Sequence, residues 1–162
     1  GISAFGLARD LRISREEAQG YINRYYERYP GVRKFMDNAI EHAKDLGYVE
    51  TLFGRRRYIP ELKSKNYSQR QFGERVAMNT PIQGTAADII KFAMVRAARE
   101  LRQRELDARL VLQIHDELII EAPDDEVEEV ATLMQEAMVG ASDLQVPLVA
   151  EVVKGKNWLD ME

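Results

Sequence analysis

The clearest pattern of hydrophobic and polar positions in this chain lies in residues 109–123, RLVLQIHDELIIEAP. The pattern has a period of two over residues 110–114 and again over residues 118–121, as in half-buried strands. A polar run, residues 115–117, separates these two segments. The sequence therefore predicts a β-hairpin whose apolar flanks pack into a sheet and whose tip carries an imidazole and two carboxylates.

A period near 3.6 predicts helices over most of the remaining chain. Ser14 followed by Glu17 is a capping box for the second helix, and Gly47 is placed to end the third. The aromatic residues of these helices, including Tyr21 and Tyr25, are interpreted as core rather than as a platform for stacking bases. The expected helices cover residues 3–12, 14–28, 31–46, 68–104 and 124–140.

The longest expected helix contains Pro81, which cannot donate a helical hydrogen bond and must perturb the helix. Thr85 and Asp88 form a variant of the capping box, so we expect a second part to begin near Thr85. If the helix continues with only a kink, Arg75, Asn79 and Gln83 share one face, because they are spaced four residues apart. Such a row can donate hydrogen bonds to phosphates and to minor-groove acceptors of DNA. A solvated helix surface is the alternative interpretation.

Shorter features complete the pattern. Residues 48–60 are predicted to form a second hairpin with Gly54 near its turn, and residues 61–67 an exposed loop. Residues 148–153, LVAEVV, are predicted to form a last strand beside the central hairpin. Trp158 is expected to pack the C-terminal tail against the rest of the chain.

The composition indicates an ordinary globular protein of one domain, or of two small lobes that share a core. Hydrophobic residues make up 45% and charged residues 31% of the 162 positions. The absence of cysteine excludes disulfides and thiolate zinc sites, and His42 and His115 are too few for a multi-histidine metal site. No apolar run reaches the roughly 20 residues of a membrane span, and no signal peptide is present, which favours a cytoplasmic protein. The start without Met indicates a fragment.

The net charge of −4 conceals a strong asymmetry. Residues 1–110 carry 21 Lys and Arg against 14 Asp and Glu, a balance of +7, whereas residues 111–162 carry 2 against 13, a balance of −11. A basic half beside an acidic half favours a polyanionic partner on one side and a metal ion or solvent on the other. Solvated helix surface is the alternative for much of this charge.

The hairpin tip has the chemistry of a Mg²⁺ site, because hard cations prefer carboxylate oxygens and a rigid strand end would hold them in place. Neighbouring strand residues point to opposite faces. We therefore assign Asp116 as the metal ligand and Glu117 as a partner acting through water. A two-metal centre needs at least one more carboxylate from another segment. An ordinary polar turn at the surface is the alternative.

Three adjacent arginines, Arg55, Arg56 and Arg57, lie beside the turn of the smaller hairpin and repel one another unless an anion lies close. Arginine suits bidentate contact with phosphate. These three residues and Arg70 are therefore candidate phosphate contacts, with a solvated basic turn as the alternative.

Several stretches together resemble family A DNA polymerases, the DNA polymerase I type. VLQIHDELIIEAP resembles the third conserved motif of that family, and ERVAMNTPIQGTAADIIKFAM resembles the helix that precedes it. YVETLFGRRRYIPEL resembles the fingers region, and GISAFGLA the stretch just after the nucleotide-binding helix. The resemblance runs in order along the whole chain.

The resemblance implies roles at the hairpin tip. Asp116 matches the metal-binding aspartate, Glu117 a neighbouring carboxylate near the primer terminus, and His115 a histidine that contacts the primer end. The implied reaction is template-directed transfer of a deoxynucleoside monophosphate from a dNTP to a primer 3′ hydroxyl, with release of pyrophosphate and with two Mg²⁺ ions. The implied partners are primer-template DNA, dNTP and the remainder of the polymerase, in the bacterial cytoplasm or nucleoid and not at a membrane.

Further positions match residues of the family that contact DNA. Gln83 and Asn79 match minor-groove contacts around the terminal base pair, and Arg75 matches a template-side contact. Ser3 and Phe5 match positions near the templating base.

The implied fold is α+β. Residues 1–70 would form a helical fingers portion with a small hairpin, and residues 71–162 a palm portion with a long helix, an antiparallel sheet around the central hairpin, and a C-terminal helix and strand. The family's strand with a second metal-binding aspartate and its nucleotide-binding helix lie outside the chain. We therefore predict that these 162 residues alone do not polymerise DNA, and that the incomplete sheet favours association.

Two other functions remain compatible with the residues. One is a metal-dependent phosphodiesterase that uses Asp116 and Glu117 together with a further carboxylate cluster. The other is a non-catalytic nucleic-acid-binding module with salt-sensitive binding to duplexes, which would use Arg55–Arg57, Arg70, Arg75 and Gln83.

Overall fold

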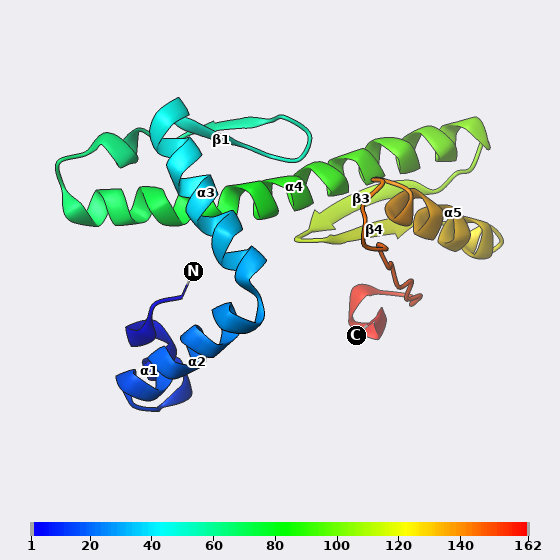
Figure 1. The fold of residues 1–162 in the computed structure, drawn as a ribbon. Helices are drawn as coiled ribbons and strands as arrows, with labels where there is room; N and C mark the ends of the chain where they lie inside the picture. Colours follow the sequence, from blue (N-terminus) through cyan, green and yellow to red (C-terminus); the bar gives the residue numbers. More distant parts are fainter. Residues whose placement is uncertain (1, 162) are drawn as a thin grey trace. The chain divides into compact units, whose positions relative to one another are not determined.

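The computed structural model describes residues 2–161, which form helices and two small antiparallel sheets (Figure 1). The helices are α1 (Ala4–Leu11), α2 (Arg15–Arg28), α3 (Pro30–Leu46), α4 (Tyr67–Gln103) and α5 (Val127–Val139), with short 3₁₀-helices η1 (Pro60–Lys63) and η2 (Trp158–Met161). The strands are β1 (Tyr48–Glu50), β2 (Arg56–Tyr58), β3 (Arg109–Ile114) and β4 (Glu117–Glu121). The predicted α+β class is confirmed.

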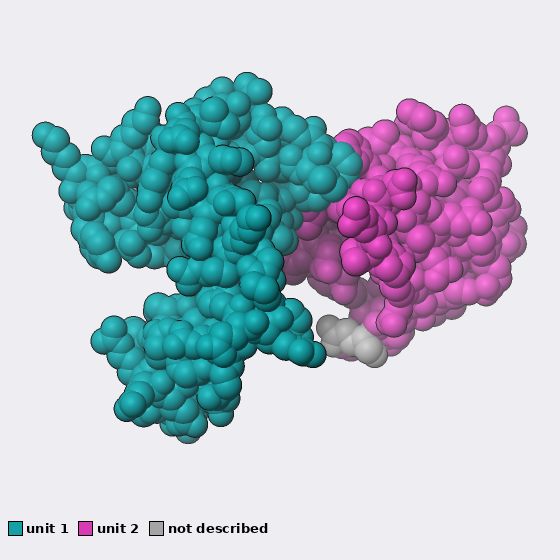
Figure 2. All heavy atoms as spheres, viewed as in Figure 1, with its two compact units in different colours: residues 1–85 teal, residues 86–162 magenta. Residues whose placement is uncertain are grey.

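The chain divides into two compact units, residues 1–85 and residues 86–162 (Figure 2). The boundary between them falls inside α4. Each unit has its own cluster of buried apolar residues. Over residues 2–161, no helix has both the length and the apolar character needed to cross a bilayer.

Local signals begin and end the helices of the first unit where the sequence predicts. Ser14 Oγ accepts a hydrogen bond from the backbone N–H of Glu17 at 3.1 Å and so caps α2. Ser3 caps α1 in the same way, accepting from the N–H of Gly6 at 3.1 Å. Helix α3 ends at Gly47, whose φ of 81° lies in the left-handed region that favours glycine. The predicted cap of α2 and the predicted end of α3 are confirmed.

The tyrosines of α2 lie outside the core, so their interpretation as core residues was wrong. Tyr21 is 46% exposed and Tyr25 is 50% exposed, whereas Ala18 is fully buried. The rings pack against their neighbours on the same helix: Tyr25 lies 5.2 Å from Tyr29 between ring centroids, and the Arg24 guanidinium lies 4.9 Å from the Tyr21 ring. Ala18 therefore occupies the buried position of α2, and the large tyrosine rings are only about half buried.

The core of the first unit joins α3, the β1–β2 hairpin, η1 and α4. Its buried residues are Ala43, Val49, Ile59, Leu62 and Ala77. Strands β1 and β2 pair antiparallel, and Gly54 has a φ of 79° in their connection, which confirms the predicted second hairpin. The expected exposed loop over residues 61–67 was wrong in part. The first residues of this range belong to η1, in which Leu62 turns inward and is only 8% exposed.

Helix α4 continues through Pro81, so the predicted second start at Thr85 was wrong. The Thr85 hydroxyl instead donates to the carbonyl oxygen of Pro81 one turn earlier, a bond that a threonine makes within a helix. The β1–β2 connection braces this turn: the N–H of Leu52 donates to Thr85 Oγ1 at 2.9 Å, and Arg55 Nη2 donates to the carbonyl oxygen of Gly84 at 3.0 Å.

The central hairpin of the second unit is confirmed, with β3 and β4 paired antiparallel. The strict alternation predicted along its first strand was wrong, because Val111 forms a β-bulge. Leu110 pairs with Ile120 and Leu112 pairs with Ile119, so one extra residue is inserted on β3. The shift leaves Leu112 43% exposed.

One face of the hairpin packs against the C-terminal half of α4 and against α5. The buried residues of this cluster are Ala97, Leu101, Ala108, Val130, Leu133, Met134 and Ala137. Leu118 and Ile120 of β4 pack against the cluster and are partly buried. The base of the hairpin is therefore fixed by apolar contacts.

The predicted last strand over residues 148–153 was wrong. Within the described part of the chain, β3 and β4 pair only with each other. The backbone of this segment is held by a side chain instead, since Gln135 Nε2 donates to the carbonyl oxygen of Ala150 at 2.9 Å. A β-rich sequence forms a strand only where it pairs with a neighbouring strand, and this segment pairs with neither edge of the hairpin.

Ion pairs, and not the tryptophan, hold the tail that follows. Lys154 pairs with Glu128, and Lys156 Nζ lies 2.7 Å from Asp124 Oδ1. The hydrogen bond from Lys156, reinforced by its charge, lowers the pKa of Asp124 below its ordinary value. Trp158 is 50% exposed, so the expectation that it packs the tail down was wrong.

Candidate functional site

The tip of the central hairpin is a two-residue turn, His115 and Asp116, one residue shorter than the polar run in the sequence. Glu117 is already the first residue of β4 and pairs with Ile114. His115 has a φ of 52°, in the left-handed region, which suits the first position of a two-residue hairpin turn. The side chains of His115, Asp116 and Glu117 are all exposed. The turn thus presents its polar groups away from the packed base.

The carboxylate of Asp116 is available to a ligand. Among residues 2–161, no side chain or backbone group forms a hydrogen bond or ion pair with it. A carboxylate oxygen on a fixed turn suits a hard divalent cation such as Mg²⁺. Over the same residues, however, no three histidine or acidic side chains converge closely enough to hold a metal ion. Asp116 fits as one ligand of a metal site that needs further donors.

The polar face predicted along the long helix exists, because α4 is unbroken. Arg75, Asn79 and Gln83 follow one another at intervals of four residues within α4, and all three are exposed. The Arg75 guanidinium lies 6.0 Å from the ring centroid of Phe72 on the same helix. The face therefore presents one guanidinium and two carboxamides to solvent.

The four arginines predicted to contact phosphate differ in the contacts that their side chains make within the chain. Arg55 donates to the carbonyl oxygen of Gly84, and Arg70 Nη1 donates to two backbone carbonyl oxygens at 2.9 Å. Arg56 Nε donates to Glu50 at 2.7 Å, and this hydrogen bond is the largest cause that raises the pKa of Arg56. Among the described residues, the Arg57 side chain alone of the four has no such contact.

The two residues expected near a templating base lie at the start of α1. Ser3 is the N-cap, and its hydroxyl oxygen already accepts the hydrogen bond that caps the helix. Phe5 is 68% exposed, so its ring is open to a partner. The structure brings these two residues together on one helix end.

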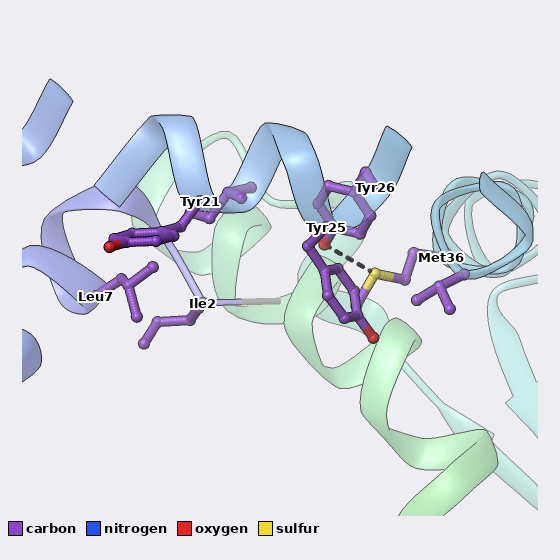
Figure 3. Close-up of a pocket in the computed structure, with 8 residues that line it drawn as sticks. Ile2, Leu7, Tyr21, Tyr25, Tyr26 and Met36 are labelled. Atoms are coloured by element: carbon purple, nitrogen blue, oxygen red, sulfur yellow. Dashed lines mark hydrogen bonds between the residues drawn. The ribbon is translucent and has the colours of Figure 1, made fainter. Parts of the chain in front are cut away.

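An apolar pocket of about 520 Å³ between α1, α2 and α3 was not foreseen from the sequence (Figure 3). The labelled side chains that line it are Ile2, Leu7, Tyr21, Tyr25, Tyr26 and Met36. The hydroxyl of Tyr26 donates to Met36 Sδ at 3.3 Å, which ties α2 to α3 at its edge. None of the predicted site residues lines this pocket. The sequence feature that could have indicated this pocket is that α2 carries several tyrosines, more than the helix buries.

A second feature missed by sequence reasoning is Gln113 of β3. Its Nε2 donates to the carbonyl oxygen of His115 at 3.0 Å and so bridges the strand and the turn. The signal that could have found it was a long carboxamide side chain two residues before the tip.

Comparison with known proteins places this geometry in context. DNA polymerase I of Caldicellulosiruptor bescii is 50% identical over 160 residues, which is 99% of this chain and 19% of that protein. DNA polymerase I of Bacillus subtilis is 52% identical over 160 residues, 99% of this chain and 18% of that protein. The chain thus spans about a fifth of the length of these relatives.

A solved structure agrees with these relatives. The POL domain of Pol1 from M. smegmatis, in complex with DNA primer-template and dNTP, superposes with a TM-score of 0.95 at 43% identity. The match covers 99% of this chain and 28% of that domain's chain. The family model described as "DNA polymerase family A" matches residues 1–160. The chain belongs to DNA polymerase family A.

Proposed function

We propose that this chain is the part of a family A DNA polymerase that supplies one metal-binding carboxylate and part of the DNA-binding surface. The reaction is template-directed transfer of a deoxynucleoside monophosphate from a dNTP to a primer 3′ hydroxyl, with release of pyrophosphate. The observation that carries the proposal is Asp116, exposed and unpaired on a hairpin turn whose base is fixed by buried apolar residues. The match to DNA polymerase I relatives over 99% of the chain supports it.

Asp116 would be the ligand of Mg²⁺, with Glu117, the first residue of β4, acting through water. Two Mg²⁺ ions bound in the completed centre would stabilise the charge that develops on the primer oxygen and on the triphosphate. This chain would contribute by positioning the Asp116 carboxylate. The packed base of the hairpin fixes the turn, and the turn sets where the Asp116 carboxylate lies before the substrates arrive.

The DNA contacts would be divided between the two units. In the first unit, Asn79 and Gln83 would donate to minor-groove acceptors and Arg75 to the template strand, since all three are exposed on one helix. In the second unit, His115 would contact the primer end. Ser3 and Phe5 would lie near the templating base.

The phosphate contacts would fall mainly to Arg57. Its guanidinium is exposed and makes no hydrogen bond or ion pair with any other described residue. Arg55, Arg56 and Arg70 would add positive charge while keeping the contacts they already make within the chain. Arginine is suited to this role because its planar guanidinium can donate twice to one phosphate.

The proposed division of roles is a fingers portion over residues 1–70 and a palm portion over residues 71–162, in a bacterial cytoplasmic enzyme. The remainder of the polymerase would supply the other metal-binding carboxylate and the groups that bind the triphosphate. A single carboxylate leaves two divalent cations short of ligands, so the isolated chain would not extend a primer. A phosphodiesterase built on Asp116 and Glu117 would face the same shortage of carboxylates, because no third one lies close among the described residues.

The test is Asp116→Ala in the polymerase that contains this chain. We expect nucleotide incorporation to fall by at least about 10³-fold, because the loss of a metal ligand removes charge stabilisation that acts in the transition state. Binding of a primer-template duplex should change by less than about threefold, since Asp116 donates nothing to DNA. Stopped-flow incorporation and fluorescence anisotropy measure the two quantities.

Asp125→Ala is the matched control, because Asp125 is an exposed carboxylate in the same unit. It should leave both the rate and the binding unchanged. A fall in duplex binding as large as the fall in rate would contradict the metal role of Asp116. Full activity of Asp116→Ala would contradict the proposed function as a whole.

A further inference from the structure

The turn that carries Asp116 depends on an unfavourable backbone conformation. His115 has a φ of 52°, and residues with a side chain rarely adopt positive φ. Among the described residues, the other two non-glycine positions with positive φ, Arg12 and Glu105, directly follow or nearly follow the ends of helices α1 and α4. Helix ends commonly take this conformation. His115 is the one such residue within a β-hairpin, where it occupies the first position of the two-residue turn.

The side chain of Gln113 contacts this turn. Its Nε2 donates to the carbonyl oxygen of His115 at 3.0 Å. That carbonyl belongs to the peptide group that joins His115 to Asp116. A peptide group is planar, so restraining its oxygen also restrains the N–H and the Cα of Asp116. The hydrogen bond therefore reaches the backbone from which the Asp116 carboxylate projects.

The backbone of Gln113 is itself well placed to act as an anchor. Gln113 pairs with Leu118 in the β3–β4 ladder, and Leu118 packs against the buried cluster formed by α4 and α5. The carboxamide thus connects the packed base of the hairpin with its exposed turn. Among residues 2–161, no other side chain donates a hydrogen bond to the turn formed by His115 and Asp116.

We infer that Gln113 is a positioning residue: its carboxamide locks the peptide between His115 and Asp116 and so sets the direction of the Asp116 carboxylate. The inference rests on the proposed role of Asp116 as a metal ligand. Misplacement of a reacting group by about 1 Å can reduce a rate by roughly 10²-fold, so a lock of this kind has a measurable effect on chemistry. It has little effect on binding of a long duplex, because that binding draws on many other contacts.

The test is carried out on the polymerase that contains this chain, with Gln113→Met and Gln113→Leu. Methionine keeps the length of the side chain and leucine keeps much of its volume, and neither can donate a hydrogen bond. Both variants should lower the single-turnover rate of incorporation by about 10-fold or more, with the Kd for duplex within about twofold. Both should also need a higher Mg²⁺ concentration for half-maximal rate, because the ligand no longer points to one place.

Gln135→Leu is the matched control. Gln135 is a glutamine of the same unit whose Nε2 also donates to a backbone carbonyl oxygen, that of Ala150, at 2.9 Å. This variant should leave the rate and the Mg²⁺ dependence unchanged. Thermal melting of all variants separates a loss of positioning from a loss of fold: a shift in Tm shared by Gln113→Met and Gln135→Leu is structural, whereas the change in Mg²⁺ dependence is not.

Two results would overturn the inference. One is a normal rate and normal Mg²⁺ dependence in both Gln113 variants. The other is a loss of duplex binding equal to the loss of rate, which would make Gln113 a DNA contact. The parallel Asp116→Ala measurement keeps the two proposals distinct. If Asp116→Ala is inactive while the Gln113 variants are normal, only the positioning role fails. If Asp116→Ala is active, the proposed function fails first.

Discussion

At the scale of single residues, Gly84 decides how closely the first hairpin can approach α4. A Cβ atom on Gly84 would lie 2.7 Å from Thr51 Cγ2, closer than real side chains come to one another. Thr51 is only 6% exposed, so its methyl group cannot move aside into solvent. Arg55 donates to the carbonyl oxygen of Gly84 at the same place. Gly84 is therefore required for its lack of a side chain and not for backbone freedom.

Gly84→Ala should accordingly destabilise the chain. Alanine in place of glycine inside a helix ordinarily stabilises by about 0.5–1 kcal/mol, but overpacking a closed site costs about 1–3 kcal/mol. We expect a net loss of about 1–2 kcal/mol in the free energy of unfolding, measured by urea denaturation.

Gly20→Ala provides the contrast within the same unit. Gly20 lies inside α2, and a Cβ there would meet nothing closer than Arg24 Nη1 at 3.7 Å, an ordinary contact. This substitution should stabilise by about 0.5–1 kcal/mol. Equal stabilisation by both substitutions would show that the close approach of Thr51 to Gly84 does not exist in solution.

Residue-scale predictions from the sequence succeeded where the signal is local. Ser14 caps α2 and Gly47 ends α3, because each effect depends on groups within a few residues. They did not extend to contacts that depend on a distant partner. Nothing local shows that Arg55 donates to Gly84, or that Arg56 pairs with Glu50 across the β1–β2 hairpin.

At the scale of elements, the structure of α4 near Pro81 depends on a brace from the β1–β2 connection. Thr85 Oγ1 accepts from the N–H of Leu52 at 2.9 Å and donates to the carbonyl oxygen of Pro81. Its hydroxyl therefore uses both its acceptor and its donor capacity. The sequence alone predicted a helix start at Thr85, because Thr85 and Asp88 match a variant of the capping box after Pro81. The brace is not visible in the sequence.

Thr85→Val should weaken the brace without changing the size of the side chain. We expect a loss of about 1 kcal/mol, the usual contribution of a hydrogen bond. Exchange of the Leu52 amide hydrogen should become several-fold faster, as measured by hydrogen–deuterium exchange, because its acceptor is gone.

Thr132→Val is the control, since Thr132 Oγ1 donates only to Glu128 one turn earlier, on the exposed side of α5. It should change the unfolding free energy by less than about 0.5 kcal/mol. Unchanged exchange at Leu52 in Thr85→Val would count against the brace.

Element-scale prediction was sound for both hairpins and for the helices other than the second start expected near Thr85, because periodicity and turn residues specify them locally. It failed for residues 148–153, since a strand also requires pairing with a neighbouring strand, and this segment pairs with neither edge of the β3–β4 hairpin. The bulge at Val111 was likewise not predicted. It inserts one residue into β3, exposes Leu112, and so departs from the simple alternation in the sequence.

At the scale of the whole molecule, the chain contains two units, each with its own buried cluster. The candidate site was predictable in part: the sequence placed Asp116 at the tip of a hairpin, and the structure has it there, exposed and unpaired. The lock by Gln113 was not predictable, because it depends on a positive φ at His115 that no sequence pattern reports.

The central claim is that Asp116 holds a divalent cation in a family A polymerase. Cleavage by metal-generated radicals tests it most directly, with Fe²⁺ in place of Mg²⁺, ascorbate and peroxide, and the polymerase bound to primer-template and dNTP. We predict backbone cleavage beside Asp116, lost in Asp116→Ala and retained in Asp125→Ala. Cleavage confined to other segments, or unchanged cleavage at the hairpin tip of Asp116→Ala, would contradict the account.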